Sequence, residues 1–250
     1  MTESVGYYRQ FSIISICHNR WSHLAESWIS WCHQDYPRVQ RIVVVSGEQD
    51  SSNLLRESGF DGVIIRVHNC PYFRPSFLRN LGLLAATGEY LGFVDADITL
   101  HPSWVSHCVS LLRRSSDLLV RKDLYEQRDP GGASGTCAIS RWLFEKIRGY
   151  NENLDLAWGY EDTDLYLRGQ RAGGRFGAYS ISLVTHRNHD DVLRGQYFRE
   201  RVAPRTPRLL VQHMRTCDLD AAVHPYEANR VRRVSFPPVN LDVRAAGEQR

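Results

Sequence analysis

The residues that decide the fold are Tyr90–Asp97, YLGFVDAD, in which an apolar run leads directly into two aspartates. The run Tyr90–Val94 predicts a buried strand, and Asp95-Ala96-Asp97 follows at its carboxyl end. Two carboxylates separated by one residue at a strand end can point into one cleft, and hard divalent cations prefer such oxygen ligands. The stretch predicts a metal-binding edge of a sheet; a solvated turn is the alternative for this tripeptide taken alone.

The segments on either side of this stretch alternate between strand and helix patterns. Strands are predicted at Phe11–Cys17, Arg41–Val45, Gly62–Val67, Asp117–Arg121 and Tyr179–Thr185. Helices are predicted around Trp21–Trp31, Phe77–Ala85, Trp104–Leu112 and Arg141–Arg148, and a further helix is predicted to open with the residues from Trp158 to Asp162. This alternation predicts an α/β fold with a mostly parallel sheet, helices on both faces, and ligands beyond the carboxyl ends of the strands.

The composition excludes several classes of protein. The chain has 250 residues, of which 42% are hydrophobic and 24% charged, as in globular proteins. A net charge of +3 does not predict nucleic-acid binding. No apolar run is long enough to cross a bilayer, and no secretory signal is seen. The six cysteines lack CxxC spacing, so a reducing, cytoplasmic setting is expected. The arginine-containing stretch after Pro204 is expected to be a solvated tail, with peripheral membrane contact as the alternative.

The segment Phe73–Thr99 carries three features in order: Arg79-Asn80, the turn ATGEY at 86–90, and Asp95-Ala96-Asp97. In this it resembles the nucleotide-binding half of inverting GT-A glycosyltransferases, particularly family 2. The resemblance implies that Asp95 lies near the donor ribose, that Asp97 binds the metal and that Arg79 lies near the nucleotide, with Ala96 in the same contact. The alternative for Arg79 and Asn80 is a pair on a helix surface.

The segment Cys137–Gly173 contains WGYED at 158–162, followed by Asp164, Leu165 and Arg168. It resembles the acceptor-side segment of family 2 enzymes, polypeptide N-acetylgalactosaminyltransferases and β-1,4-galactosyltransferases. Inverting transfer needs a carboxylate that takes the acceptor proton. The resemblance favours Asp162 as this base and Glu161 as a partner of the acceptor, with the two roles exchangeable; the alternative is that both only cap a helix. Acceptor or sugar contacts are expected at Trp158 and Gly159 and at the glycine-rich stretch from Gly132 to Gly135, where glycine leaves the backbone accessible.

The remaining site residues also follow from the resemblance. His186 is expected to complete the shell of a manganese or magnesium ion with Asp97; His189 is the alternative, and Asp95 is a further candidate ligand. His18, Asn19 and Arg20 fit the loop that contacts the nucleotide. The acidic turn that usually follows the second strand is missing, and Ser46 or Glu48 is expected to take its place. The base of the nucleotide therefore stays open, with UDP favoured by its frequency in the family.

These observations predict a metal-dependent inverting transferase that moves a sugar from a nucleotide-sugar to a hydroxyl of a glycan, a lipid-linked sugar, a peptide or a small molecule. The expected division is a domain at 1–203, with a nucleotide-binding half at about 1–100 and an acceptor half at about 101–203, and an extension at 204–250. The alternatives are a nucleotidyltransferase, which usually carries a glycine-rich loop after the first strand, and a non-catalytic relative. No P-loop, dinucleotide fingerprint or G-x-S-x-G elbow is present.

Overall fold

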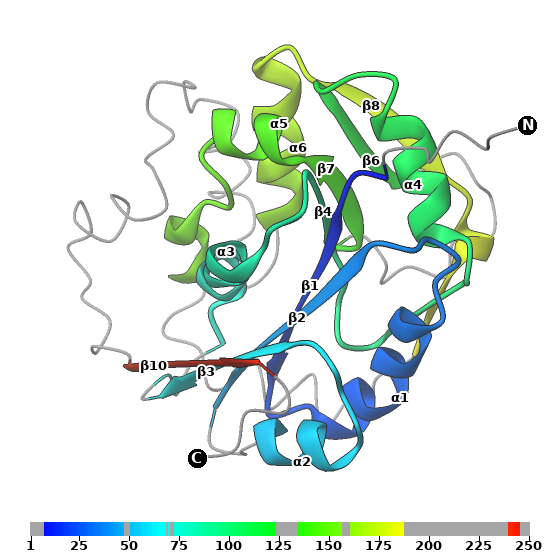
Figure 1. Cartoon of the computed structure of the whole chain (residues 1–250). Helices are drawn as coiled ribbons and strands as arrows, with labels where there is room; N and C mark the ends of the chain where they lie inside the picture. Colours follow the sequence, from blue (N-terminus) through cyan, green and yellow to red (C-terminus); the bar gives the residue numbers. More distant parts are fainter. Residues whose placement is uncertain are drawn as a thin grey trace, which may run out of the picture.

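The computed structural model of the chain describes residues 8–47, 51–68, 70, 73–123, 135–156, 161–187 and 240–245. Its main sheet has the strand order β10-β3-β2-β1-β4-β7-β6-β8 (Figure 1). The strands of this sheet are β1 (Phe11–His18), β2 (Val39–Ser46), β3 (Val63–His68), β4 (Tyr90–Phe93), β6 (Leu118–Lys122), β7 (Cys137–Ser140), β8 (Arg175–Tyr179) and β10 (Asn240–Ala245). A second, two-stranded sheet pairs β5 (Ile98–Leu100) with β9 (Val184–His186).

The centre of the sheet is parallel. Strand β1 pairs in parallel with β2, from Phe11↔Val39 to His18↔Ser46, and also with β4, while β2 pairs in parallel with β3. Strand β7 runs antiparallel to β4 and β6, and β10 runs antiparallel to β3. The carboxyl ends of four neighbouring parallel strands therefore meet at one edge of the sheet, which is where ligands bind in open α/β sheets.

Helices cover both faces of the sheet (Figure 1). Helices α1 (Trp21–Cys32), α2 (Ser51–Glu57) and α4 (Trp104–Leu112) lie over one face, and α3 (Pro75–Ala85), α5 (Arg141–Lys146) and α6 (Glu161–Arg171) over the other. Two short 3-10 helices, η1 (Glu152–Leu156) and η2 (Ile181–Leu183), complete the described elements. Among the described residues, no helix is both long and apolar enough to cross a membrane.

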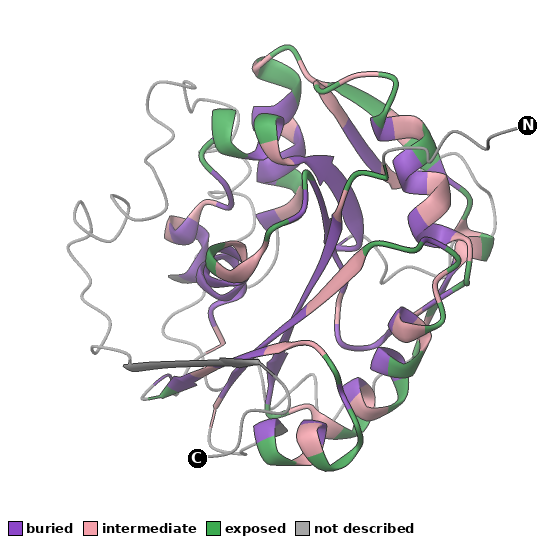
Figure 2. Cartoon of the chain, viewed as in Figure 1, coloured by how far each residue is buried: buried purple, intermediate pink, exposed green. Residues whose placement is uncertain are grey.

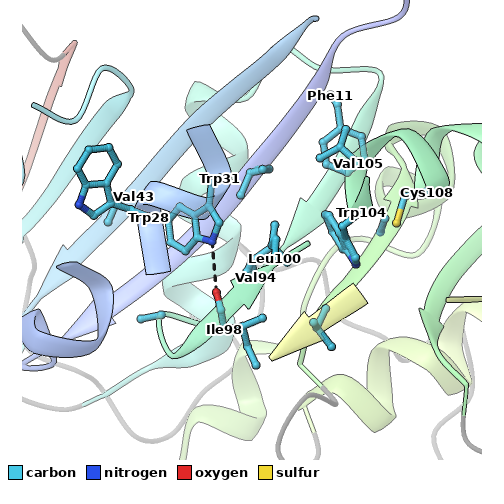
Figure 3. Close-up of a cluster of buried hydrophobic side chains, with 14 of the residues drawn as sticks. Phe11, Trp28, Trp31, Val43, Val94, Ile98, Leu100, Trp104, Val105 and Cys108 are labelled. Atoms are coloured by element: carbon cyan, nitrogen blue, oxygen red, sulfur yellow. Dashed lines mark hydrogen bonds between the residues drawn. The ribbon is translucent and has the colours of Figure 1, made fainter. Parts of the chain in front are cut away.

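The sheet supplies the buried centre of the molecule (Figure 2). All eight residues of β1 are buried, because helices pack on both of its faces. On one face, Trp28 and Trp31 of α1 belong to the same buried cluster as Phe11 and Trp104 (Figure 3), and the rings of Phe11 and Trp104 meet edge to face at 5.9 Å. The indole of Trp31 also donates to the carbonyl of Ile98 at 3.4 Å, which ties α1 to the strand that follows Asp97.

The predicted α/β class and mostly parallel sheet are confirmed, and the four strands predicted between residues 11 and 94 are found. The prediction of one strand at 179–185 is wrong. The chain turns after β8, because the Ser180 side chain accepts a hydrogen bond from the Ser182 amide at the start of η2, and β9 then joins a different sheet. Residues 240–245 of the expected extension add an edge strand to the main sheet, whereas the division at residue 203 stays a prediction.

Candidate active site

The two aspartates that follow β4 lie at the carboxyl edge of the sheet, and Asp97 is almost fully buried. Pairing of β5 with β9 places His186 opposite Ile98, and the Arg187 amide donates to the Asp97 carbonyl at 3.0 Å. As a result, His186 Nε2 lies 3.8 Å from Asp97 Oδ2. The same carboxylate oxygen is 3.4 Å from Arg20 Nη1, which comes from the loop after β1. The side chains of Asp97, His186 and Arg20 are therefore neighbours in space, although these residues are far apart in the sequence.

Arg79 connects this edge to the second acidic group. Its side chain is buried on α3, and its Nη2 donates to Asp95 Oδ1 at 2.8 Å. Its Nη1 donates to Glu161 Oε1 at 3.2 Å and lies 3.8 Å from Asp162 Oδ1. The guanidinium also lies over the Tyr150 ring, 5.0 Å from its centroid. A buried guanidinium needs such partners, because an unpaired charge inside a protein is strongly unfavourable.

Glu161 and Asp162 begin α6, where the partial positive charge of the helix terminus favours acidic side chains. They also face Arg79, so they do more than cap the helix. Glu161 Oε2 is buried and has no hydrogen-bond partner among the described residues. A buried carboxylate oxygen in that position can accept a hydrogen bond from a bound hydroxyl group.

The pKa of the Asp162 carboxyl group is shifted toward neutral pH by its surroundings. Burial raises the pKa of Asp162 from 3.8 to about 8; the neighbouring Glu161 carboxylate also raises it, and Arg79 opposes this rise. Burial likewise raises the pKa of Asp95, against the opposing effect of Arg79. A carboxylate with a pKa near the working pH is suited to general-base catalysis.

The nucleotide side of the site is formed by the ends of β1 and β2. His18 Nδ1 and Ser46 Oγ lie 2.9 Å apart, and both side chains are buried. Contact of Ser46 with a nucleobase would therefore require the exchange of this hydrogen bond. Asn19 and Gly47 have positive φ angles of 54° and 90°, and a Cβ on Gly47 would lie 2.3 Å from Asn19 Oδ1, so only glycine fits there.

The structure brings His18, Ser46, Arg20, Arg79, Asp95, Asp97, Glu161, Asp162 and His186 to the carboxyl edge of the sheet. Asn19 belongs to the same loop, and Ala96 is buried between the two aspartates. Five other predicted site residues, Glu48, Gly132, Trp158, Gly159 and the alternative metal ligand His189, lie outside the described residues.

The donor groups around Asp97 fit a divalent cation that also binds a substrate. Asp97 and His186 supply one carboxylate and one imidazole, and the described residues contain no cluster of three or more His, Cys, Asp or Glu that could hold a metal. Two protein ligands suit magnesium or manganese, because such ions usually take further ligands from substrate phosphates and water. Asp95 is the weaker candidate ligand, since Arg79 already binds its carboxylate.

Gly135 belongs to the glycine-rich stretch at which the sequence predicts close approach of the acceptor or the sugar, whereas its contact with Asp95 and Arg79 was not predicted. A Cβ at this position would lie 2.4 Å from Asp95 Oδ2 and 3.0 Å from Arg79 Nη2. The glycine-rich stretch at 131–135 was the available signal, because glycine often marks close approach of the backbone to functional groups.

The sheet with helices on both faces has the GT-A fold of glycosyltransferases. The chain belongs to glycosyl transferase family 2, whose sequence model matches residues 12–161. It is 31% identical over 108 residues to the succinoglycan biosynthesis protein ExoM of Rhizobium meliloti (strain 1021), with 40% of this chain and 34% of that protein covered. The chain thus spans about a third of this curated relative.

Solved structures support the same fold. Residues 1–349 of S. aureus TarS in complex with UDP-GlcNAc match with a TM-score of 0.61 and 17% identity, over 88% of this chain and 70% of that one. The mannosyltransferase PcManGT from Pyrobaculum calidifontis, in complex with GDP-Man and Mn²⁺, matches with a TM-score of 0.61 and 18% identity, over 90% and 75%. A further crystal structure of residues 1–349 of S. aureus TarS matches with a TM-score of 0.55 and 18% identity, over 68% of this chain and 58% of that one. At these identities the likeness concerns the fold.

Proposed function

We propose that this glycosyltransferase moves a sugar, with inversion, from a nucleoside diphosphate-sugar to an acceptor hydroxyl. The observation that carries the proposal is the position of Arg79, which binds Asp95 after β4 and Glu161 at the start of α6. This shared contact supports the proposal, because a direct displacement requires the donor-side and acceptor-side groups to lie close together.

Asp162 is the proposed base. In the displacement, the acceptor oxygen forms a bond to the anomeric carbon, the bond from that carbon to the phosphate oxygen breaks, and the hydroxyl proton passes to Asp162. The raised pKa of Asp162, about 8, supports this role, because the carboxylate then holds the proton it receives. Glu161, with its buried free oxygen, is the proposed partner of the acceptor hydroxyl, and exchange of the two roles is the alternative.

The donor is proposed to lie against the loop that carries His18, Asn19 and Arg20, with Arg79 and Asp95 beside it. Asp97 and His186 are the residues that would hold manganese or magnesium. When bound, the cation would supply positive charge that stabilises the departing nucleoside diphosphate. Arg20, which lies against Asp97, is the proposed partner of a phosphate oxygen.

UDP is the proposed nucleotide. TarS was solved with UDP and with UDP-GlcNAc, and PcManGT with GDP-Man and Mn²⁺, so related folds accept both bases. We further propose that the segment around α6 receives the acceptor in the manner of the N-acetylgalactosaminyltransferases and galactosyltransferases that it resembles, and that residues 1–203 form the catalytic domain. A cytoplasmic location fits the five described cysteines, which are free thiols.

A thermal-shift series tests the proposal. UDP, GDP, UDP-sugars and GDP-mannose are added with MnCl₂ or with EDTA, and release of nucleoside diphosphate is then followed for each sugar nucleotide that stabilises the chain. We expect UDP with Mn²⁺ to raise the melting temperature, and Asp97→Asn to remove this rise. The matched control is Asp61→Asn, at an exposed carboxylate paired with Arg41. Absence of stabilisation by every nucleotide in the wild type would refute the donor class.

The same assay separates the alternatives. A nucleotidyltransferase would consume a nucleoside triphosphate with a sugar phosphate and release pyrophosphate, which the family 2 match does not favour. A non-catalytic relative would bind a sugar nucleotide without releasing the diphosphate in the presence of any acceptor.

A further inference from the structure

The side-chain amide of Asn80 joins α3 to the segment that leads into α6. Its Nδ2 donates to the Tyr150 carbonyl at 2.9 Å and to Glu152 Oε1 at 3.0 Å. Its Oδ1 accepts a hydrogen bond from the Tyr150 amide at 2.9 Å. Asn80, Tyr150 and Glu152 are all buried, so water does not compete for these three hydrogen bonds.

Asp155 makes a second connection between the same two segments. Its Oδ1 accepts from the Ser76 amide at 2.8 Å and its Oδ2 from the Phe77 amide at 3.0 Å. These amides lie in the first turn of α3, where backbone N–H groups have no partner within the helix. The guanidinium of Arg74 lies 3.9 Å from both Glu152 and Asp155, which balances the two buried charges.

Tyr150 connects Asn80 with the Arg79 guanidinium of the candidate site. Its backbone is held by Asn80 on both the amide and the carbonyl side. Its ring lies 5.0 Å from the Arg79 guanidinium and meets the ring of Phe93, at the end of β4, edge to face at 5.0 Å. The Tyr150 ring therefore supports the guanidinium that binds Asp95, Glu161 and Asp162.

We propose that Asn80 is a positioning residue for sugar transfer: through Tyr150 and Glu152 it holds the acceptor-side segment against α3, so that Arg79 meets the carboxylates of both halves. The proposal rests on the proposed function for its kinetic consequence, whereas the structural coupling can be measured without any substrate. Asn80 follows Arg79 directly in the sequence. One turn of α3 therefore provides both the guanidinium that pairs with Asp95 and Glu161 and the amide that binds Tyr150 and Glu152.

The chemical step should respond to Asn80 more strongly than donor binding does. Apart from Arg79, the described residues proposed to bind the nucleotide lie at the ends of β1, β2 and β4, which are fixed by sheet pairing and not by Asn80. The base at 162 is instead carried by a segment whose contacts with α3 include those of Asn80 and Asp155. Displacement of a catalytic group by about 1 Å can lower a rate by about a hundredfold.

The test compares Asn80→Asp, Glu152→Gln and the double variant with the control Ser12→Ala. Asn80→Asp places a carboxylate oxygen against Glu152 and the Tyr150 carbonyl, whereas Glu152→Gln in the same chain supplies a donor for it. Ser12→Ala also removes buried hydrogen bonds, to Gln40 and Gly88, but at the amino end of β1, far from the site. Affinity for UDP with Mn²⁺, the rate of UDP release from a UDP-sugar, and hydrogen exchange in 161–171 are measured for each variant.

We expect Asn80→Asp to lower the rate by about tenfold to a hundredfold, with UDP affinity within about twofold of the wild type, and to speed hydrogen exchange in 161–171. The double variant should recover several-fold of the lost rate. Equal losses of rate and UDP affinity, no recovery in the double variant, or effects matched by Ser12→Ala would overturn the proposal. If Asn80→Asp does not fold, Asn80→Ala removes the amide without adding charge, and unchanged exchange in 161–171 would refute the coupling. A wild type that binds no nucleotide would instead refute the donor class.

Discussion

Arg79 Nη1 lies 3.2 Å from Glu161 Oε1, and these two residues are 82 positions apart in the chain. Arg79 belongs to the helix before the Asp95-Ala96-Asp97 strand end, and Glu161 belongs to the first turn of α6. Because Arg79 also binds Asp95, a single buried guanidinium pairs both with a carboxylate that follows β4 and with one that begins α6. The contribution of the Arg79 side chain to the stability of this arrangement can be measured with substitutions.

Arg79→Ala should destabilise the chain by about 3–5 kcal/mol, because it leaves Asp95, Glu161 and Asp162 close together without a compensating charge. Arg79→Lys should lower the free energy of unfolding by a smaller amount, because an ammonium keeps the positive charge. It should still destabilise the chain, because the ammonium cannot contact both Asp95 and Glu161 at once. Urea unfolding measures both changes. Arg141→Ala is a useful comparison, as Arg141 binds the carbonyls of Ala86 and Gly88 away from the site. Equal stability of Arg79→Ala and the wild type would show that the buried ion pairs contribute nothing.

Asp162→Asn should lower the rate of sugar transfer by at least about a hundredfold while nucleotide affinity stays unchanged, because the amide keeps the shape of the side chain but cannot take a proton. Glu161→Gln should raise the KM for the acceptor by a larger factor than it lowers kcat. Steady-state kinetics with the acceptor varied distinguishes these effects. If Glu161→Gln abolishes transfer and Asp162→Asn mainly raises the KM for acceptor, the roles of the two residues are exchanged.

The sequence was sufficient for the fold because its strands are long apolar runs, such as those of β1 and β2, which only a buried parallel sheet accommodates. It did not reveal β5 or β7, which have three and four residues and are too short to show a period. The short helix α2 was also not predicted, because its residues 51–57 are mostly polar.

The candidate site was foreseen in its parts but not in its connections. The sequence predicted that the acidic clusters containing Asp97 and Asp162 converge on one crevice. The alternative of a surface pair for Arg79 and Asn80 is wrong, since both side chains are buried. The contacts of Asn80 with Tyr150 and Glu152 span 70 and 72 residues, and no local pattern encodes such pairings. Burial of the Ser46 hydroxyl against His18 was equally invisible to sequence patterns, because it depends on strand register.

The rate of transfer should rise with pH up to about 8 and then level off, because the proposed base Asp162 must be deprotonated to act and burial raises its pKa to about 8. The ionisable groups that face it are Glu161, Arg79, Asp95, Cys137, Tyr150 and Tyr166. A pH–rate profile of kcat/KM measures this effect. A rate independent of pH between about 5 and 8 would exclude Asp162 as the titrating base.

The same raised pKa has a consequence for stability. A carboxyl group whose pKa is higher in the folded chain favours folding fully below its unfolded pKa, and this contribution is lost as the pH rises through the folded value. For Asp162 the loss should occur between about 4 and about 8. Asp162→Asn carries no charge at any pH, so it should be more stable than the wild type above pH 8 by about 1 kcal/mol or more, with the difference decreasing toward pH 4. Urea unfolding at several pH values checks this, and a constant difference would contradict the assigned pKa.

Arg20→Ala should change the affinities for metal and for nucleotide in opposite directions. Arg20 Nη1 and His186 Nε2 both lie near Asp97 Oδ2, at 3.4 and 3.8 Å, so a cation bound by Asp97 and His186 competes with the guanidinium. Removal of Arg20 should tighten Mn²⁺ binding in the absence of nucleotide and weaken binding of UDP. Titration with Mn²⁺ followed by electron paramagnetic resonance measures the first effect, and calorimetry the second. Arg20→Lys should lie between the wild type and Arg20→Ala, whereas weaker Mn²⁺ binding in Arg20→Ala would show that the arginine assists the cation.

Gly135→Ala should reduce transfer although the side chain it adds is only a methyl group. The new Cβ would lie 2.4 Å from Asp95 Oδ2 and 3.0 Å from Arg79 Nη2, so the carboxylate or the backbone has to move. Gly135 has no positive φ angle, hence the effect should come from this contact and not from backbone strain.

Gly169→Ala in α6 is the matched control, because its Cβ meets only Leu119 at 3.7 Å, an ordinary contact. We expect Gly135→Ala to lower the rate of diphosphate release by about tenfold or more while Gly169→Ala stays near the wild type. A small displacement of Asp95, the carboxylate proposed to lie beside the donor, should cost far more in rate than in stability. Equal activity of the two variants would mean that the space beside Asp95 can relax, and that Asp95 does not need its observed position against Arg79.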